Sequence, residues 1–168
     1  MALTLADGRV KLTILTSAPA DLAAITLTEL AAGLNAGPWV NKPDFRMSPT
    51  DSDTVTDQPL SQAGNAKTFG NSNYDARMTT LRDLATTGLP EAAGDLVHKA
   101  VATKGTRVWL VRRTGPLETV DWADGDPYDV AEVITDEPQQ PSDLGGYVKN
   151  VIPLGAQTWT TGVVTDES

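Results

Sequence analysis

Short runs of strand character recur along the whole chain, and they constrain the fold more than any other feature. Residues 9–16 alternate, with Val10, Leu12 and Ile14 on one face and polar residues on the other. A period of two is typical of a strand with one buried face. Comparable strand segments follow at 74–83, 107–113, 128–135 and 147–154. This order predicts a β-rich fold of the α+β class, formed as a single domain over residues 1–168.

One amphipathic helix interrupts the strands, and it is predicted over residues 91–103. Pro90 suits the first helical position, and Gly105 suits the position after the helix end. We expect an apolar stripe at helical spacing to pack into the core. The core candidates on this stripe are Leu96, Val97, Ala100 and Val101. His98, which is the chain's one histidine, is expected to be partly exposed on the same helix.

A second helical segment of one or two turns is indicated near residue 30. Thr26 and Glu29 have the spacing of a capping box, and Gly33 or Gly37 would end the helix. The alternative interpretation of this segment is an irregular polar loop.

The longest polar stretch covers residues 48–73 and contains only isolated apolar side chains, at Val55, Leu60 and Phe69. A connection of this length in a compact domain is usually functional or disordered. A weak hairpin is a further alternative. The last residues, 157–168, are expected to form a C-terminal extension, either as a final strand or as a flexible end.

The excess of acidic residues argues against a protein that binds nucleic acid through a basic surface. The chain has 13 basic and 22 acidic residues, a net charge of −9 and no cysteine, so it also lacks disulfides and thiolate metal sites. One histidine cannot supply a His-based metal site or a catalytic triad, and no phosphate-binding glycine loop occurs. We therefore expect no enzyme, cofactor or metal. We also expect no membrane anchor, because no apolar run is long enough to span a bilayer.

Nine acidic residues and no Lys or Arg lie between Thr114 and Val148. One interpretation is a solvated loop, and another is a negatively charged functional surface. A third is a site for a hard cation such as calcium, although the spacing does not match an EF-hand loop. The carboxylates that this third interpretation would use are Asp121, Asp124, Asp126 and Asp129.

Five stretches, taken in order, resemble the tail-tube proteins of long-tailed bacteriophages, particularly those that infect actinobacteria. They are residues 26–37, Tyr74-Asp75-Ala76-Arg77, the segment 104–115, Ala123-Asp124-Gly125-Asp126 followed by Val130 and Val133, and residues 147–149. The resemblance implies an antiparallel β-sandwich with one flanking α-helix and a long polar loop. It also implies hexameric rings that stack into a hollow tube, which serves as a conduit for DNA delivery.

The partners implied by the resemblance are further copies of the chain, a tape-measure protein inside the tube, a tail terminator at its end, and DNA in transit without specific binding. The expected location is the virion tail, with synthesis in the cytoplasm of the host bacterium. The alternative within the virion is another ring-forming component, such as a tail terminator or head–tail connector. An enzyme, for example a carboxylate-dependent hydrolase, is the competing class, and it lacks a nucleophile–base set in this sequence.

Two surfaces are expected to carry this function. The loop 48–73 is predicted to make contacts between rings, and its candidate residues are Asp51, Asp53, Asp57 and Phe69. The acidic stretch is predicted to line the lumen and repel DNA, with Asp124, Asp126, Asp129 and Glu132 as candidates. The alternative for these carboxylates is that they point outward and keep the tube soluble.

Overall fold

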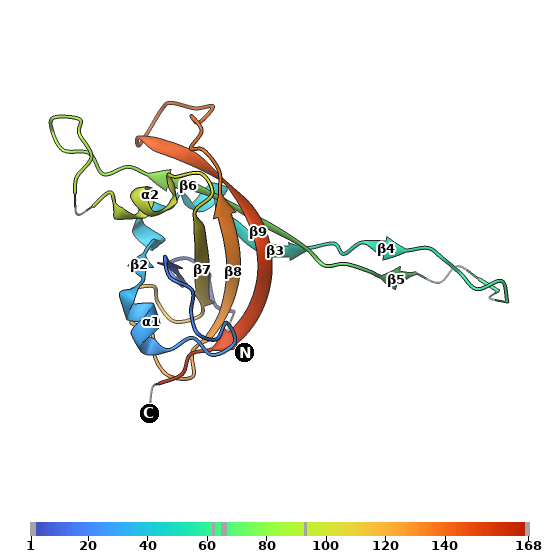
Figure 1. The fold of residues 1–168 in the computed structure, drawn as a ribbon. Coiled ribbons are helices and arrows are strands. Elements are labelled where there is room, and N and C mark those ends of the chain that lie inside the picture. Colours follow the sequence, from blue (N-terminus) through green and yellow to red (C-terminus); the bar gives the residue numbers. More distant parts are fainter. Residues whose placement is uncertain (1–2, 62, 65–66, 93, 167–168) are drawn as a thin grey trace.

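The computed structural model describes residues 3–61, 63–64, 67–92 and 94–166, and it confirms the β-rich prediction. The main element is a seven-stranded antiparallel sheet in the order β2-β1-β7-β8-β9-β6-β3 (Figure 1). The strands are β1 Val10–Leu15, β2 Leu34–Asn35, β3 Arg46–Thr50, β4 Thr54–Val55, β5 Thr68–Phe69, β6 Asn73–Leu81, β7 Arg107–Thr114, β8 Pro127–Thr135 and β9 Lys149–Val163. The helices are α1 Leu27–Ala32, α2 Leu96–Val101 and two short 3-10 turns, η1 Gly37–Trp39 and η2 Lys42–Asp44.

The long strand β9 joins the two halves of the sheet. Its residues 149–153 pair with β6, and residues 154–163 pair with β8. The two sides of the expected sandwich are therefore parts of one continuous, curved sheet (Figure 1). Of the two alternatives for residues 157–168, a final strand or a flexible end, the strand is present for residues 157–163, which complete β9. Residues 167–168 lie outside the described part of the chain.

Both faces of the central strands are buried, and a separate apolar cluster lies on each face. Along β7, Val108 and Leu110 point into one cluster, which also contains Val97 and Val101 of α2. The alternate residues Trp109 and Val111 point into the other cluster, which Leu30 of α1 covers. This alternation confirms that residues 107–113 form a strand covered on both faces.

The expectation of an exposed polar face on β1 is wrong. Lys11 and Thr13 are both buried, because the chain after β7 folds over them. The Lys11 Nζ donates to the Glu118 carbonyl at 3.0 Å, and the Trp122 Nε1 donates to the Thr13 Oγ1 at 3.0 Å. Polar side chains thus occupy a buried face when each of them finds a hydrogen-bond partner there.

The capping box of α1 is present as predicted. The Thr26 Oγ1 accepts from the Glu29 backbone N–H at 3.2 Å, and the Glu29 carboxylate accepts from the Thr26 N–H at 2.9 Å. Gly33 ends the helix against β1, where a Cβ would lie 2.6 Å from the Thr13 Cγ2. Only a glycine permits this close approach of α1 to the sheet.

The second helix, α2, is shorter than the predicted 91–103, because the chain before it is held in an extended turn. Pro90 forms an isolated bridge with Leu84 instead of starting the helix. Among the expected core residues, Val97 and Val101 are buried and Ala100 packs partly buried against them. The prediction is wrong for Leu96, whose side chain is 44% exposed. It is also wrong for His98, which is only 8% exposed.

The polar stretch between β3 and β6 forms a thin β-hairpin that projects far from the body of the protein (Figure 1). We call residues 51–72 the arm and the remainder of the described chain the body. Strands β4 and β5 pair within the arm, with Thr54 opposite Phe69 and Val55 opposite Thr68. Every described residue of the arm is exposed except Ser52, which is half-buried.

Candidate functional site

The root of the arm is held by a small set of hydrogen bonds around Asp53. The Asp53 backbone N–H donates to the Asn71 carbonyl at 2.9 Å, and the Gly70 N–H donates to the Asp53 carbonyl at 2.6 Å. The Asn73 side-chain amide adds bonds to the Asp51 carbonyl at 3.1 Å and to the Asp53 carboxylate at 3.0 Å. Asp51 and Asp53 therefore help to shape the hairpin, while Asp57 lies farther out and is exposed.

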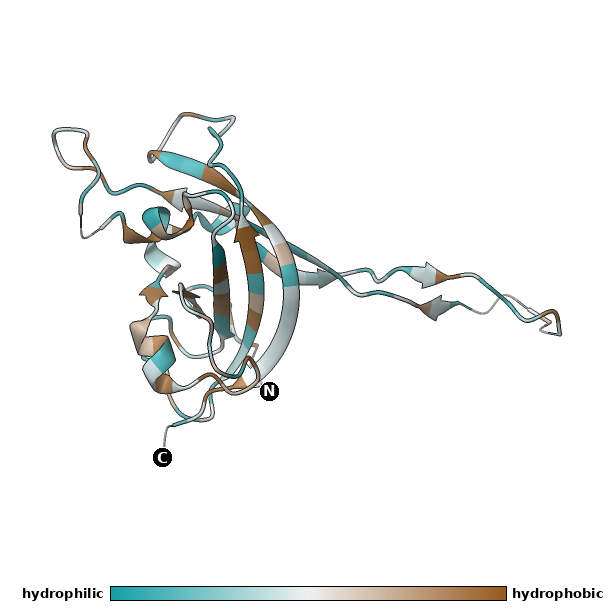
Figure 2. Cartoon of the chain, viewed as in Figure 1, coloured by the Kyte–Doolittle hydropathy of each residue, from teal (hydrophilic) through white to brown (hydrophobic). Residues whose placement is uncertain are grey.

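The arm carries apolar side chains that its own chain leaves in solvent. Leu60 is fully exposed, Phe69 is 77% exposed and Val55 is 43% exposed. Figure 2 shows short brown segments on an otherwise pale or hydrophilic arm, whereas brown segments are more extensive on β8 in the body. These side chains make the projecting arm a candidate surface for contact with another protein.

The four candidate carboxylates of the acidic stretch do not form one surface. Asp129 and Glu132 belong to β8 but lie on opposite faces of the sheet, because they are three positions apart on the strand, ahead of the β-bulge at Glu132/Val133. Asp129 shares its face with Ala131 and Glu132 shares its face with Val130, which belong to the two different apolar clusters. At most one of the two can therefore face a given neighbouring surface.

Three of these four carboxylates are paired with arginines. The Arg112–Asp129 ion pair is 2.6 Å long, Arg107–Glu132 is 2.7 Å and Arg113–Asp126 is 2.5 Å. The negative charge of these three carboxylates is thus balanced by the arginines of β7, which lies next to β8 in the sheet. Asp124 is exposed and accepts a hydrogen bond from the Asp166 backbone N–H at 3.1 Å.

Arg113 organises the loop between β7 and β8 and was not recognised from the sequence. Its fully buried guanidinium donates to the carbonyls of Leu117, Val120 and Asp121 at 2.8 to 3.2 Å, in addition to its ion pair with Asp126. It also lies 5.1 Å from the centre of the Trp122 ring. The signal in the sequence was a basic residue that ends an apolar strand just before a stretch without Lys or Arg.

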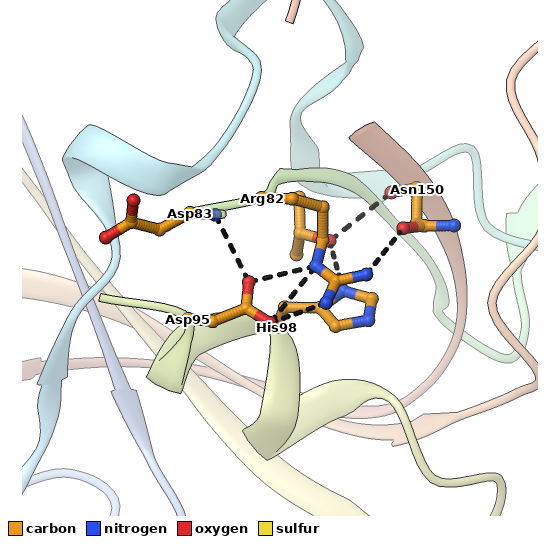
Figure 3. Close-up of polar contacts among 6 residues, drawn as sticks. Arg82, Asp83, Asp95, His98 and Asn150 are labelled. Carbon is orange, nitrogen blue, oxygen red and sulfur yellow. Dashed lines mark hydrogen bonds and ion pairs between the residues drawn. The ribbon is translucent and has the colours of Figure 1, made fainter. Parts of the chain in front are cut away.

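A second buried polar cluster fixes α2 to strands β6 and β9 (Figure 3). The Arg82 guanidinium binds the Asp95 carboxylate through two nitrogens, with Nη2 at 2.6 Å and Nε at 2.9 Å. The Thr80 Oγ1 lies 2.9 Å from the His98 Nδ1 and 3.4 Å from the Asn150 carbonyl. This cluster explains why α2 buries a histidine, since the ring bonds to β6 from inside the fold.

Burial and charge shift the pKa values in this cluster. Burial lowers the pKa of His98 below its ordinary value, and the nearby positive charge of Arg82 lowers it further. Burial alone would raise the pKa of Asp95, but hydrogen bonds from Arg82 and from the Asp83 backbone outweigh it and hold that pKa below its ordinary value. The cluster therefore contains a neutral histidine beside a salt-bridged carboxylate at neutral pH.

No metal site is assembled in the part of the chain that the structure describes. Within those residues, no group of three or more His, Asp or Glu side chains is placed to hold a metal ion. The described helices are also too short to cross a membrane.

Comparisons with known proteins identify the family. A family model for phage tail tube protein matches residues 1–165, which is nearly the whole chain. The searches of curated proteins and of solved structures found no match to this chain. The family match agrees with the strand-rich body. It also agrees with the five sequence stretches that, taken in order, resemble tail-tube proteins. The chain therefore belongs to the phage tail tube protein family.

Proposed function

We propose that copies of this chain form hexameric rings, that the rings stack into the hollow tail tube, and that DNA passes through this tube during delivery. Family membership gives the chain a structural role in the virion tail and implies self-assembly into the tube. The rings, the passage of DNA and the contacts with a tape-measure protein and a tail terminator are parts of the proposal. The proposed role is structural, without a catalytic activity.

The single observation that carries the proposal is the arm. Ordering an extended segment of this length costs conformational entropy, and the arm repays almost none of that cost by burying its own side chains. Its exposed Phe69 and Leu60 would be covered by a neighbouring copy in the tube. We therefore propose that the arm makes the contacts between rings.

Replacement of Thr54–Gly70 by an Asn-Gly turn tests this role. The Asp53–Asn71 backbone bond already brings the two ends of the shortened hairpin together, and Asn-Gly suits a two-residue connection. The variant should keep the unfolding midpoint of the parent protein and fail to form tubes in electron micrographs. Tubes of normal length from this folded variant would contradict the proposed role of the arm.

The alternative is a ring-forming terminator or connector, and the same micrographs separate it from a tube subunit. A tube subunit at high concentration gives open-ended tubes of variable length. A terminator gives single closed rings. Monomeric protein under all conditions that assemble related tubes would argue against both functions.

The proposal that carboxylates line the channel can be tested at Asp124. Reversal of Asp129 or Glu132 to lysine would also break an ion pair with Arg112 or Arg107 and would confuse the result. Asp124 takes part in no ion pair among the described residues, so Asp124→Lys changes charge with little loss of structure. DNA ejection should slow in particles that carry this variant if Asp124 faces the channel, because a lysine attracts phosphate. Asp143→Lys, in the exposed loop before β9, is the matched control.

A further inference from the structure

An open cavity of about 600 Å³ lies at the end of the body where the edge of β1 faces the segment that contains η1 and η2. Val10 and Leu12 of β1 form one wall, and Val40 and Phe45 form the opposite wall. Ala6 lies at its rim and is exposed. The cavity is therefore an apolar concavity on the surface, separate from the arm.

The cavity also borders a part of the sheet edge that has no neighbouring strand. Strand β2 pairs only with Thr13 and Ile14 of β1, and the Leu12 carbonyl accepts from the Ala36 N–H at 2.9 Å. Because backbone groups alternate in direction along a strand, Val10 presents its N–H and C=O toward the same edge as Leu12. Beyond Leu12, no strand of the described chain occupies this edge. An extended segment from outside could add to β1 there.

One cation of the cavity is open to exchange with a carboxylate of the arm. The cavity lining contains Lys42 and Arg112, which are paired with Asp7 and Asp129. The side chains of Lys42 and Asp7 are about 80% exposed, so an incoming aspartate can replace this weak pair. The arm supplies such carboxylates at Asp51, Asp53 and Asp57.

The arm carries an exposed aromatic ring that the apolar walls of the cavity can cover in a second copy. Phe69 lies four residues before Asn73, so an extended strand carries it about 13 Å beyond β6. We infer that the cavity between β1 and the η1–η2 segment receives the Phe69 portion of the arm of a neighbouring copy. This inference rests on the proposed function, and it names the surface that the arm binds.

A projection and a recess at different places on one chain give a head-to-tail contact. Such a heterologous contact leaves a free arm at one end of any assembly and a free cavity at the other, so that growth can continue. This property is what the growth of a tube requires. An isologous contact, in which two copies use the same patch, would stop at a dimer.

Disulfide cross-linking tests the inference directly, because the chain has no cysteine of its own. Thr68→Cys places a thiol beside Phe69, and Ala6→Cys places one at the rim of the cavity. The two variants are mixed in equal amounts, assembled and oxidised. A covalent dimer is expected, because a disulfide forms only when the two Cα atoms approach within about 7 Å. Ala20→Cys, at another exposed alanine near α1, is the matched control and should give no dimer with Thr68→Cys.

A second variant keeps the inference falsifiable if the cysteine variants assemble poorly. Ala6→Trp fills the cavity from an exposed position, and Ala20→Trp adds the same ring elsewhere. Both should keep the parent unfolding midpoint, and only Ala6→Trp should lose tube growth. Normal growth by Ala6→Trp, or cross-linking at Ala20 but not at Ala6, would overturn the inference. After such a result, the Asn-Gly variant that lacks the arm separates the two proposals. Tube formation by that variant would mean that the proposed function of the arm is wrong. Failure of that variant to form tubes would mean that only the cavity has been wrongly assigned.

Discussion

The body and the arm follow opposite rules of stabilisation. In the body, apolar side chains such as Ile14, Val108 and Val133 are fully buried, and the buried arginine Arg113 has partners for its charge. In the arm, no described side chain is buried and three apolar residues face solvent. The body is therefore folded by burial of its own side chains, whereas the arm has backbone pairing of its own but can bury its apolar side chains only against another molecule. Changes in the two regions should therefore separate folding from assembly.

The largest effect on folding is expected from Arg113→Ala. The change leaves Asp126 without its partner and removes the donors to three carbonyls of the loop, so it should cost about 3–5 kcal/mol of unfolding free energy. Urea unfolding followed by tryptophan fluorescence measures this loss. Arg77→Ala, on the exposed face of β6, is the control and should change stability by less than about 0.5 kcal/mol. A loss below about 1 kcal/mol for Arg113→Ala would show that the loop does not depend on the arginine.

Within α2, Val101→Ala should cost more than Leu96→Ala, although valine loses fewer atoms. Val101 is fully buried, so removal of its methyl groups costs about 2 kcal/mol, including part of a cavity. Leu96 is 44% exposed and loses little burial. Thermal unfolding of the two variants compares them. If Leu96→Ala were the more destabilising change, the helix would bury a different face from the one described.

Stability of the body should fall on acidification in two steps. The pKa of His98 is lowered by burial, so the unfolded chain takes up a proton first, and stability decreases as pH falls below the ordinary value of 6.5. The pKa of Asp95 is also lowered, so its contribution is complete above 3.8 and is lost as pH falls through its folded value. Unfolding free energies between pH 8 and pH 3 measure both steps. His98→Asn should flatten the upper step, and an unchanged slope would exclude His98 as its source.

The smallest effect on folding is expected in the arm itself. Phe69→Ser should change the unfolding free energy by less than about 0.5 kcal/mol, because the residue is 77% exposed and the change loses little buried surface. The same variant should assemble into tubes poorly. Calorimetry of the subunit and light scattering during assembly measure the two properties. A large loss of stability would mean that the arm contributes to the folding of the body, and the contrast between the two regions would then fail.

Most of the strand order could be predicted from the sequence, because hydrophobic periodicity is a local property. Residues 10–15, 107–114 and 127–135 form strands close to the predicted ranges, and the Thr26–Glu29 capping box forms as its spacing indicated. The buried face of α2 could not be predicted as well. A helix of six residues is too short for its periodicity to fix its rotation, and the contacts of His98 with Thr80 decide which side faces the sheet.

The candidate site, like the fold, was predicted from the sequence only in part. The sequence alone determined that residues 48–73 lack core-forming side chains, and that the chain resembles a tail-tube protein, because both depend on residue types in order. The three-dimensional arrangement of the strands was needed to show that this stretch is a paired hairpin, that Asp129 and Glu132 lie on opposite faces, and that arginines of β7 pair with the carboxylates of β8. These outcomes depend on which strands become neighbours and in which register. Pairing between residues far apart in the chain is selected by the burial of the whole core, and no local pattern encodes it.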